Sequence, residues 1–146
     1  MAKMTEQQRQ EFLADPHVAI LSVAGEAGRP PISVPTFYAY EPGGEITMFT
    51  GTQRRKPQRI EQIKNTGVVT VVVQREEMPP AYVTVEAELV EIGKPTHEQM
   101  LAIARRYMTE EEAEGYVRTE LGDPDNIVVL FTFRPTRWLS SDVSHD

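Results

Sequence analysis

The sequence has no cysteine and only three histidines. Without cysteine there is no disulfide framework, no thiolate metal site and no cysteine nucleophile. His17, His97 and His145 lie far apart along the chain and lack the spacing of metal ligands, so we expect no metal site. No serine has the G-x-S-x-G setting of a hydrolase nucleophile, which argues against a serine hydrolase.

Long apolar runs and an excess of positive charge are also missing. No hydrophobic run approaches the length of about 20 residues that spans a bilayer. The polar start of the chain has a helical pattern and is unlike a secretory signal. The formal net charge of −7 repels nucleic acid. We therefore expect a soluble, cytoplasmic protein that acts on a small molecule, with neither nucleic acid nor membrane as a partner.

The size and composition are those of one globular domain. The 146 residues are 40% hydrophobic and 25% charged, which is enough for one core. We expect a single domain over residues 1–146, with a helix in residues 1–15 and a loose polar tail in residues 139–146. Thr5 and Gln8 have the spacing of a capping box, which predicts the start of that helix.

Between these ends, the hydrophobic pattern is mainly that of β-strands. Runs rich in β-branched residues predict six strands, at residues 18–23, 32–40, 45–50, 68–73, 81–92 and 127–133. Helical patterns occupy residues 57–65, 95–108 and 110–121. Closely spaced antiparallel hairpins favour a barrel over a doubly wound sheet. Pro35 interrupts the second strand, which indicates an edge, a bulge or a ligand alongside.

Positive charge is concentrated in one part of this acidic chain. Five of the 15 basic residues lie within eleven positions: Arg54, Arg55, Lys56, Arg59 and Lys64. A local basic cluster on an acidic protein suggests that a small anionic ligand binds there.

Residues 50–57, with the sequence TGTQRRKP, join a predicted strand to a predicted helix. Unpaired N–H groups and the helix dipole favour an anion at a helix start. Threonine hydroxyls, guanidinium groups and an ammonium group supply the charge-assisted donors that phosphate requires. The glycine pattern of a Walker loop is absent. From spacing alone, a phosphate site and a solvated basic turn both remain possible.

Five short segments follow one another along the chain: GRPPISVP at 28–35, Arg55-Lys56 followed by Ile60, YVTVE at 82–86, Arg106-Tyr107, and FRPTRW at 133–138. In order and spacing they resemble the pyridoxamine phosphate oxidase-like, FMN-binding split-barrel superfamily, and most closely its flavin and deazaflavin (F420) oxidoreductase branch. The resemblance runs from about residue 17 to about residue 141. It implies a mainly-β fold with flanking helices, a six-stranded antiparallel split β-barrel.

The resemblance also assigns roles to the basic turn. Arg55 and Lys56 fall where the family binds the phosphate of its cofactor, with Arg54 and Gln53 as possible helpers.

The second strand lies against the cofactor ring in this family. By that match Ser33, Val34, Pro35 and Thr36 line the ring, mostly through backbone groups, although an ordinary edge strand is the alternative. The family is dimeric with cofactor sites at the subunit junction, so the resemblance implies a homodimer. Tyr82 resembles an aromatic residue that reaches the partner's site, and core packing is its alternative.

The expected function is that of an oxidoreductase that uses F420 to transfer a hydride to or from a small conjugated substrate. Because the cofactor carries the hydride, we assign no catalytic residue. An FMN-dependent oxidoreductase is the first alternative, and the density of basic residues favours F420 slightly, since F420 has an added acidic tail. A non-catalytic haem or small-ligand module is the second alternative. The chain stops soon after Trp138, before the substrate-binding region of the vitamin B6 enzymes, so we do not expect vitamin B6 oxidation.

Overall fold

The computed structural model describes residues 2–52 and 57–143. The strands in this part of the chain are β1 (Ala19–Val23), β2 (Ile32–Thr36), β3 (Ala39–Tyr40), β4 (Ile46–Gly51), β5 (Val68–Arg75), β6 (Ala81–Gly93) and β7 (Val128–Asp142). The helices are α1 (Glu6–Ala14), α2 (Gln58–Thr66), α3 (His97–Ala104) and α4 (Glu110–Gly122).

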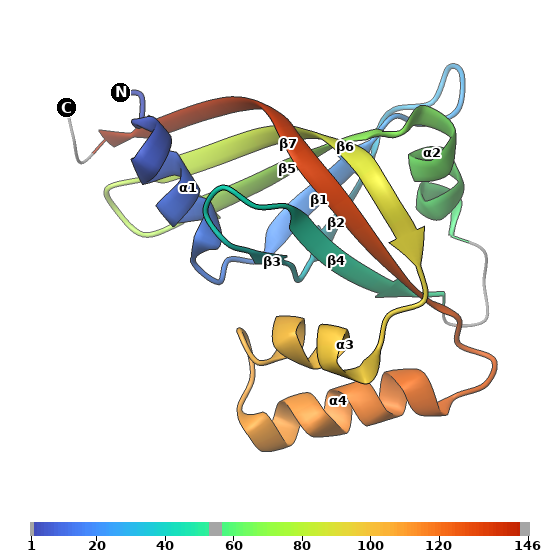
Figure 1. The fold of residues 1–146 in the computed structure, drawn as a ribbon. Coiled ribbons are helices and arrows are strands. Elements are labelled where there is room, and N and C mark those ends of the chain that lie inside the picture. Colours follow the sequence, from blue (N-terminus) through green and yellow to red (C-terminus); the bar gives the residue numbers. More distant parts are fainter. Residues whose placement is uncertain (1, 53–56, 144–146) are drawn as a thin grey trace.

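The described strands form one antiparallel sheet in the order β2-β1-β5-β6-β7-β4-β3 (Figure 1). The sheet curls, and its two edge strands, β2 and β3, are consecutive in the chain. This is the mainly-β split barrel with flanking helices that the sequence predicts, with seven strands in place of six.

The additional strand arises because the run 32–40 is broken into β2 and β3. Tyr38, at the break, is fully buried, and its hydroxyl oxygen lies 2.5 Å from the carbonyl oxygen of Leu13 and 3.0 Å from that of Asp15. These contacts turn the chain between Thr36 and Ala39, so that it leaves one edge of the sheet and enters the other. The prediction of one continuous strand was therefore wrong.

The N-terminal helix begins as the sequence predicts. The backbone N–H of Gln8 donates to the hydroxyl of Thr5 at 3.1 Å, and the side chain of Gln8 accepts from the backbone N–H of Thr5 at 2.9 Å. Leu13, near the end of α1, is fully buried in the main core. The predicted capping box is confirmed.

The last strand is longer than predicted and includes the first residues of the expected loose tail. Ser140, Ser141 and Asp142 are buried in β7, which pairs with β6. The Arg75 guanidinium lies 3.2 Å from the Asp142 carboxylate, and the backbone N–H of Asp142 donates to the carbonyl of Ala2 at 2.8 Å. Ser140 also has a polar partner, because its hydroxyl accepts from the backbone N–H of Met4 at 3.2 Å. This end of β7 is therefore held by strand pairing and by polar contacts of Ser140 and Asp142, so the expectation of a loose tail was wrong up to Asp142.

The two helices before β7 form a second, smaller core. Met100, Leu101 and Ile103 of α3 pack with Ala113 and Val117 of α4. The same cluster includes residues of the sheet, namely Phe49, Val128 and Leu130. Figure 1 shows α3 and α4 side by side beneath the end of the sheet that contains β4.

Candidate functional site

A cavity of about 660 Å³ opens where the edge strand β2 approaches the end of β4, the start of α2 and the second half of α4. Its lining consists of Val18, Ile32, Pro35, Thr36, Phe37, Phe49, Thr50, Gly51, Thr52, Pro57, Gln58, Arg59, Tyr116 and Glu120. Ligand pockets usually measure about 300–1,000 Å³, so the cavity has room for a cofactor-sized molecule.

One part of the cavity wall is apolar and aromatic. Pro35 and Phe37 come from β2 and the residue after it, Phe49 comes from β4, and Tyr116 comes from α4. The rings of Phe49 and Tyr116 lie 6.1 Å apart at 47°. Flat apolar side chains of this kind suit a planar conjugated ring.

Tyr107, which does not line the cavity, packs against Phe37 and fixes its position. The two rings are stacked, with centroids 4.3 Å apart and an angle of 20°. The hydroxyl oxygen of Tyr107 lies 2.7 Å from the carbonyl oxygen of His17 and 3.1 Å from that of Tyr38, and it accepts from the backbone N–H of Tyr38 at 3.2 Å. The Tyr107 side chain thus helps to hold the break between β2 and β3, together with the contacts of the Tyr38 hydroxyl.

Another part of the wall is polar. Arg59, in the first turn of α2, donates from its guanidinium to the hydroxyl of Thr50 at the end of β4. Burial lowers the pKa of Arg59, which is nevertheless a cation at neutral pH. Thr52 exchanges backbone and side-chain hydrogen bonds with Ile127 at 2.9 and 3.1 Å. Two hydroxyls and a cation therefore lie beside the aromatic surface.

Helix α4 supplies the remaining polar and aromatic groups. Tyr116 and Glu120 are four residues apart and lie on one face of the helix. Burial raises the pKa of the Tyr116 hydroxyl, and the negative charge of Glu120 raises it further. Tyr116 is therefore a neutral hydrogen-bonding group at neutral pH.

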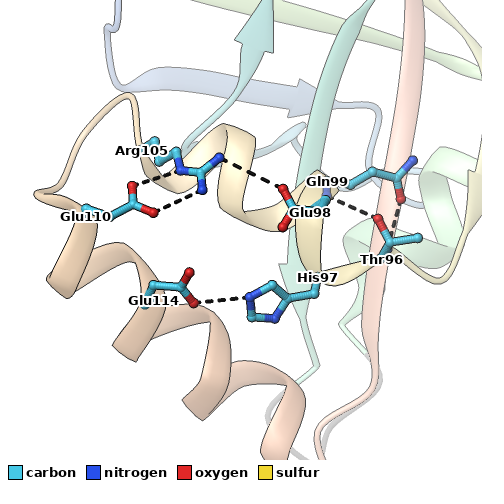
Figure 2. A network of polar contacts seen from close by, with 7 residues as sticks. All are labelled: Thr96, His97, Glu98, Gln99, Arg105, Glu110 and Glu114. Atoms are coloured by element: carbon cyan, nitrogen blue, oxygen red, sulfur yellow. Dashed lines mark hydrogen bonds and ion pairs between the residues drawn. The ribbon is translucent and has the colours of Figure 1, made fainter.

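Besides their shared apolar core, α3 and α4 are joined by polar contacts at the surface (Figure 2). The Arg105 guanidinium donates to both carboxylate oxygens of Glu110, at 2.8 and 2.9 Å, and lies 3.9 Å from Glu98. His97 Nε2 lies 3.1 Å from the Glu114 carboxylate. These contacts join the start and end of α3 to the first half of α4.

The structure brings three of the four predicted ring-binding residues to this region. Pro35 and Thr36 line the main cavity. Val34 lines an adjoining cavity of about 190 Å³, which also includes Thr50 and Arg59. Ser33 lines neither cavity, and its hydroxyl lies 2.8 Å from that of Ser22.

Tyr82 is half-buried on β6 and does not line the cavity of its own chain. The predicted phosphate ligands Gln53, Arg54, Arg55 and Lys56 lie outside the described residues.

Sequence reasoning missed the contribution of α4 and of the aromatic residues. Phe37, Phe49, Tyr116 and Glu120 were not predicted as site residues, although the i, i+4 spacing of Tyr116 and Glu120 places them on one helix face. Only the tertiary fold brings that face to the end of β4.

In residues 2–52 and 57–143, no group of three acidic or histidine side chains converges in a way that holds a metal ion. No helix among these residues is both long and apolar enough to cross a membrane.

Comparison with known proteins places the fold in a family. The family model of pyridoxamine 5'-phosphate oxidase matches residues 5–140. No curated protein matches the sequence. An F420 reductase structure has a TM-score of 0.67 at 21% identity, covering 89% of this chain and 94% of that chain.

Two further solved structures have the same fold. A conserved hypothetical protein from Mycobacterium tuberculosis has a TM-score of 0.72 at 20% identity and covers 95% of this chain and 85% of that chain. An FAD-binding protein from Mesorhizobium loti has a TM-score of 0.59 at 15% identity and covers 97% of this chain and 95% of that chain. The family match spans nearly all of the described fold.

Proposed function

The chain belongs to the pyridoxamine 5'-phosphate oxidase family, and from that premise we propose that it is an oxidoreductase that binds the deazaflavin F420 in the cavity between β2, β4 and α4. When bound, such a cofactor accepts or donates a hydride, and the protein supplies binding and orientation. The substrate is a small conjugated molecule. FMN is the alternative cofactor for the same cavity.

The observation that carries this proposal is the arrangement of the cavity wall. Aromatic and apolar side chains lie beside the polar group of Thr50, Thr52 and Arg59, as a molecule with a flat ring and a polar chain requires. Thr52 and Pro57, the residues on either side of the segment QRRK, both line the cavity. We infer that Arg55 and Lys56 of this segment bind the cofactor phosphate, with Arg54 and Gln53 as helpers.

Strand β2 is the proposed support for the ring. Among the described strands it is an edge strand that pairs with β1 alone, so half of its backbone groups have no partner in these strands. Val34, Pro35 and Thr36 are its cavity-lining residues, and we expect Ser33, which lines neither cavity, to contribute at most through its backbone. The chain holds the ring mainly by shape and backbone hydrogen bonds, with Phe37 and Tyr116 on the aromatic side of the cavity.

F420 is proposed ahead of FMN on charge. In the sequence, three consecutive basic residues, Arg54, Arg55 and Lys56, stand between Thr52 and Pro57, which line the cavity together with Arg59. F420 carries more negative charge than FMN. The F420 reductase of known structure supports this choice, and the FAD-binding relative from Mesorhizobium loti supports the flavin alternative.

A second copy of the chain completes the proposed site. Pro35, Ile20, Val72, Thr84 and Leu139 are direct partners across five neighbouring strands and form an outward stripe. Exposed fractions of 39% for Ile20 and 61% for Leu139 leave much of this apolar surface uncovered in one chain. The stripe ends at Pro35, which lines the cavity.

The same face includes Tyr82, two residues before Thr84 on β6, so a partner that covers the stripe is in reach of Tyr82. We expect a dimer interface of about 2,000 Å² or more in total. Sedimentation velocity at micromolar concentration should show a dimer, and Leu139→Glu should shift it toward monomer. A stable wild-type monomer would contradict the proposed junction site.

The non-catalytic haem module is less well supported. None of the described residues that line the cavity is a histidine, the side chain most often used to bind haem iron.

The absorption spectrum of the freshly purified protein, with mass identification of the molecule released on denaturation, separates these functions. We expect F420 or its flavin counterpart, and tighter binding of F420 than of FMN in fluorescence titrations. A haem spectrum, or no binding of either cofactor, would overturn the proposal.

A further inference from the structure

Helix α4 places a carboxylate in the polar part of the cavity. Glu120 is half-buried and lines the cavity together with Arg59 and Thr50. It lies one helical turn after Tyr116, which lines the aromatic part of the same wall. A negative charge is unexpected in a site for an anionic cofactor and therefore needs a specific explanation.

The position of this carboxylate is set by two neighbours. The side-chain amide of Asn126 donates to Glu120 Oε2 at 2.8 Å, and it also lies 3.0 Å from the carbonyl oxygen of Glu120. Gly51, at the end of β4, leaves the space that Glu120 occupies, because a Cβ at this position would lie 2.7 Å from Oε2. Among the described residues, Glu120 Oε1 accepts no hydrogen bond from another side chain.

The chemistry of a carboxylate excludes phosphate as its partner. An ionised carboxylate only accepts hydrogen bonds, and a phosphate also presents acceptor oxygens and negative charge. A hydroxyl group both donates and accepts. The donors of Arg59, the hydroxyl of Thr50 and the acceptor of Glu120 together suit a chain of hydroxyl groups.

We propose that Glu120 binds the polyol chain that joins the ring to the phosphate in a flavin-type cofactor. This inference rests on the proposed function and deepens it. Glu120 accepts hydrogen bonds from the polyol hydroxyls through the oxygen that Asn126 leaves free. Phosphate binding belongs to another part of the site. Glu120 has a binding role and takes no part in hydride transfer.

The test uses ligands that differ only in the polyol and contain no phosphate. Riboflavin has the ring and the polyol, lumiflavin has the ring alone, and a corresponding pair carries the F420 ring. Affinities are measured by fluorescence titration of the purified full chain in its natural oligomeric state. Because no ligand carries phosphate, loss of charge at position 120 does not relieve a repulsion that would obscure the result.

We expect Glu120→Gln to weaken binding of the polyol-bearing ligand by about tenfold or more, as expected for one hydrogen bond to a charged acceptor. Binding of the matched ring without polyol should be unchanged. Glu111→Gln, an exposed residue of the same helix that does not line the cavity, is the control and should alter neither affinity. Gly51→Ala, which displaces the Glu120 carboxylate but keeps its charge, should reproduce the selective loss.

The outcomes separate this inference from the function on which it rests. Equal losses for both members of a ring pair, or no loss for either, would overturn the role of Glu120 while leaving the cofactor cavity in place. Failure of the wild-type protein to bind either ring, with or without the polyol, would overturn the proposed function itself. Circular dichroism spectra of both variants show whether each is folded, and the Gly51→Ala result decides the question if Glu120→Gln is not.

Discussion

Replacement of Tyr107 by phenylalanine tests how the break between β2 and β3 is held. The substitution keeps the ring that stacks on Phe37 and removes only the hydroxyl. That hydroxyl contacts the carbonyl oxygens of His17 and Tyr38 at 2.7 and 3.1 Å and accepts from the backbone N–H of Tyr38 at 3.2 Å. Its removal leaves partly buried backbone groups without their partner, which costs about 1–3 kcal/mol.

We therefore expect Tyr107→Phe to lower the free energy of unfolding by about 2 kcal/mol and Tm by about 4–8 °C. Urea unfolding followed by circular dichroism, at a fixed protein concentration, measures the change. Tyr116→Phe is the matched control, because among the described residues the Tyr116 hydroxyl donates to no protein group. Equal stabilities of the two variants would refute the structural role given to the Tyr107 hydroxyl.

Three further results are expected. Lys56→Ala should weaken binding of F420 or FMN about ten- to a hundredfold and reduce the effect of salt on affinity. Lys64→Ala, in the same basic cluster, should do neither. Equal affinities of wild type and Lys56→Ala at low salt would contradict the phosphate role. Ser33→Ala should change cofactor affinity little, while Pro35→Ala should weaken it, and titration of both variants would expose a misplaced ring if the order were reversed. Burial raises the pKa of four tyrosines, Tyr38, Tyr40, Tyr107 and Tyr116. The stability conferred by their neutral form is therefore present below pH 10, the ordinary pKa of tyrosine, and is lost as pH rises above it. Absorbance at 295 nm should show these groups ionising at higher pH than free tyrosine, and ionisation at or below pH 10 would contradict their burial.

The sequence predicts helix ends well where neighbouring residues form the cap. The capping box of Thr5 and Gln8 fixes the start of α1, and Gly67, with φ of 70°, ends α2 in the left-handed conformation that glycine favours. In each case the residues that form the contacts lie within a few positions of one another.

Contacts between distant residues determine what the sequence did not predict. Tyr38 breaks the second predicted strand because its hydroxyl reaches carbonyl groups 23 and 25 residues earlier. The polar end of β7 is buried because Arg75, 67 residues before Asp142, pairs with it. The sequence pattern identifies residues 32–40 as apolar and residues 140–142 as polar. It does not show that distant residues break the first segment into two strands and bury the second.

The candidate site depends on the same kind of contact. Phe37 and Tyr38 connect β2 and β3, which lie at opposite edges of one curled sheet. The cavity forms between the end of β2 and the end of β4, which do not pair with each other. Closing that gap with hydrogen bonds would fill the space beside Pro35 and remove the free edge of β2, which is the surface proposed to hold the ring. The Tyr107 hydroxyl keeps the break in place from the α3–α4 side, and α4 covers the opening with Tyr116 and Glu120. A change in the α3–α4 pair is therefore expected to alter ligand binding even where it leaves β2 and the basic turn intact.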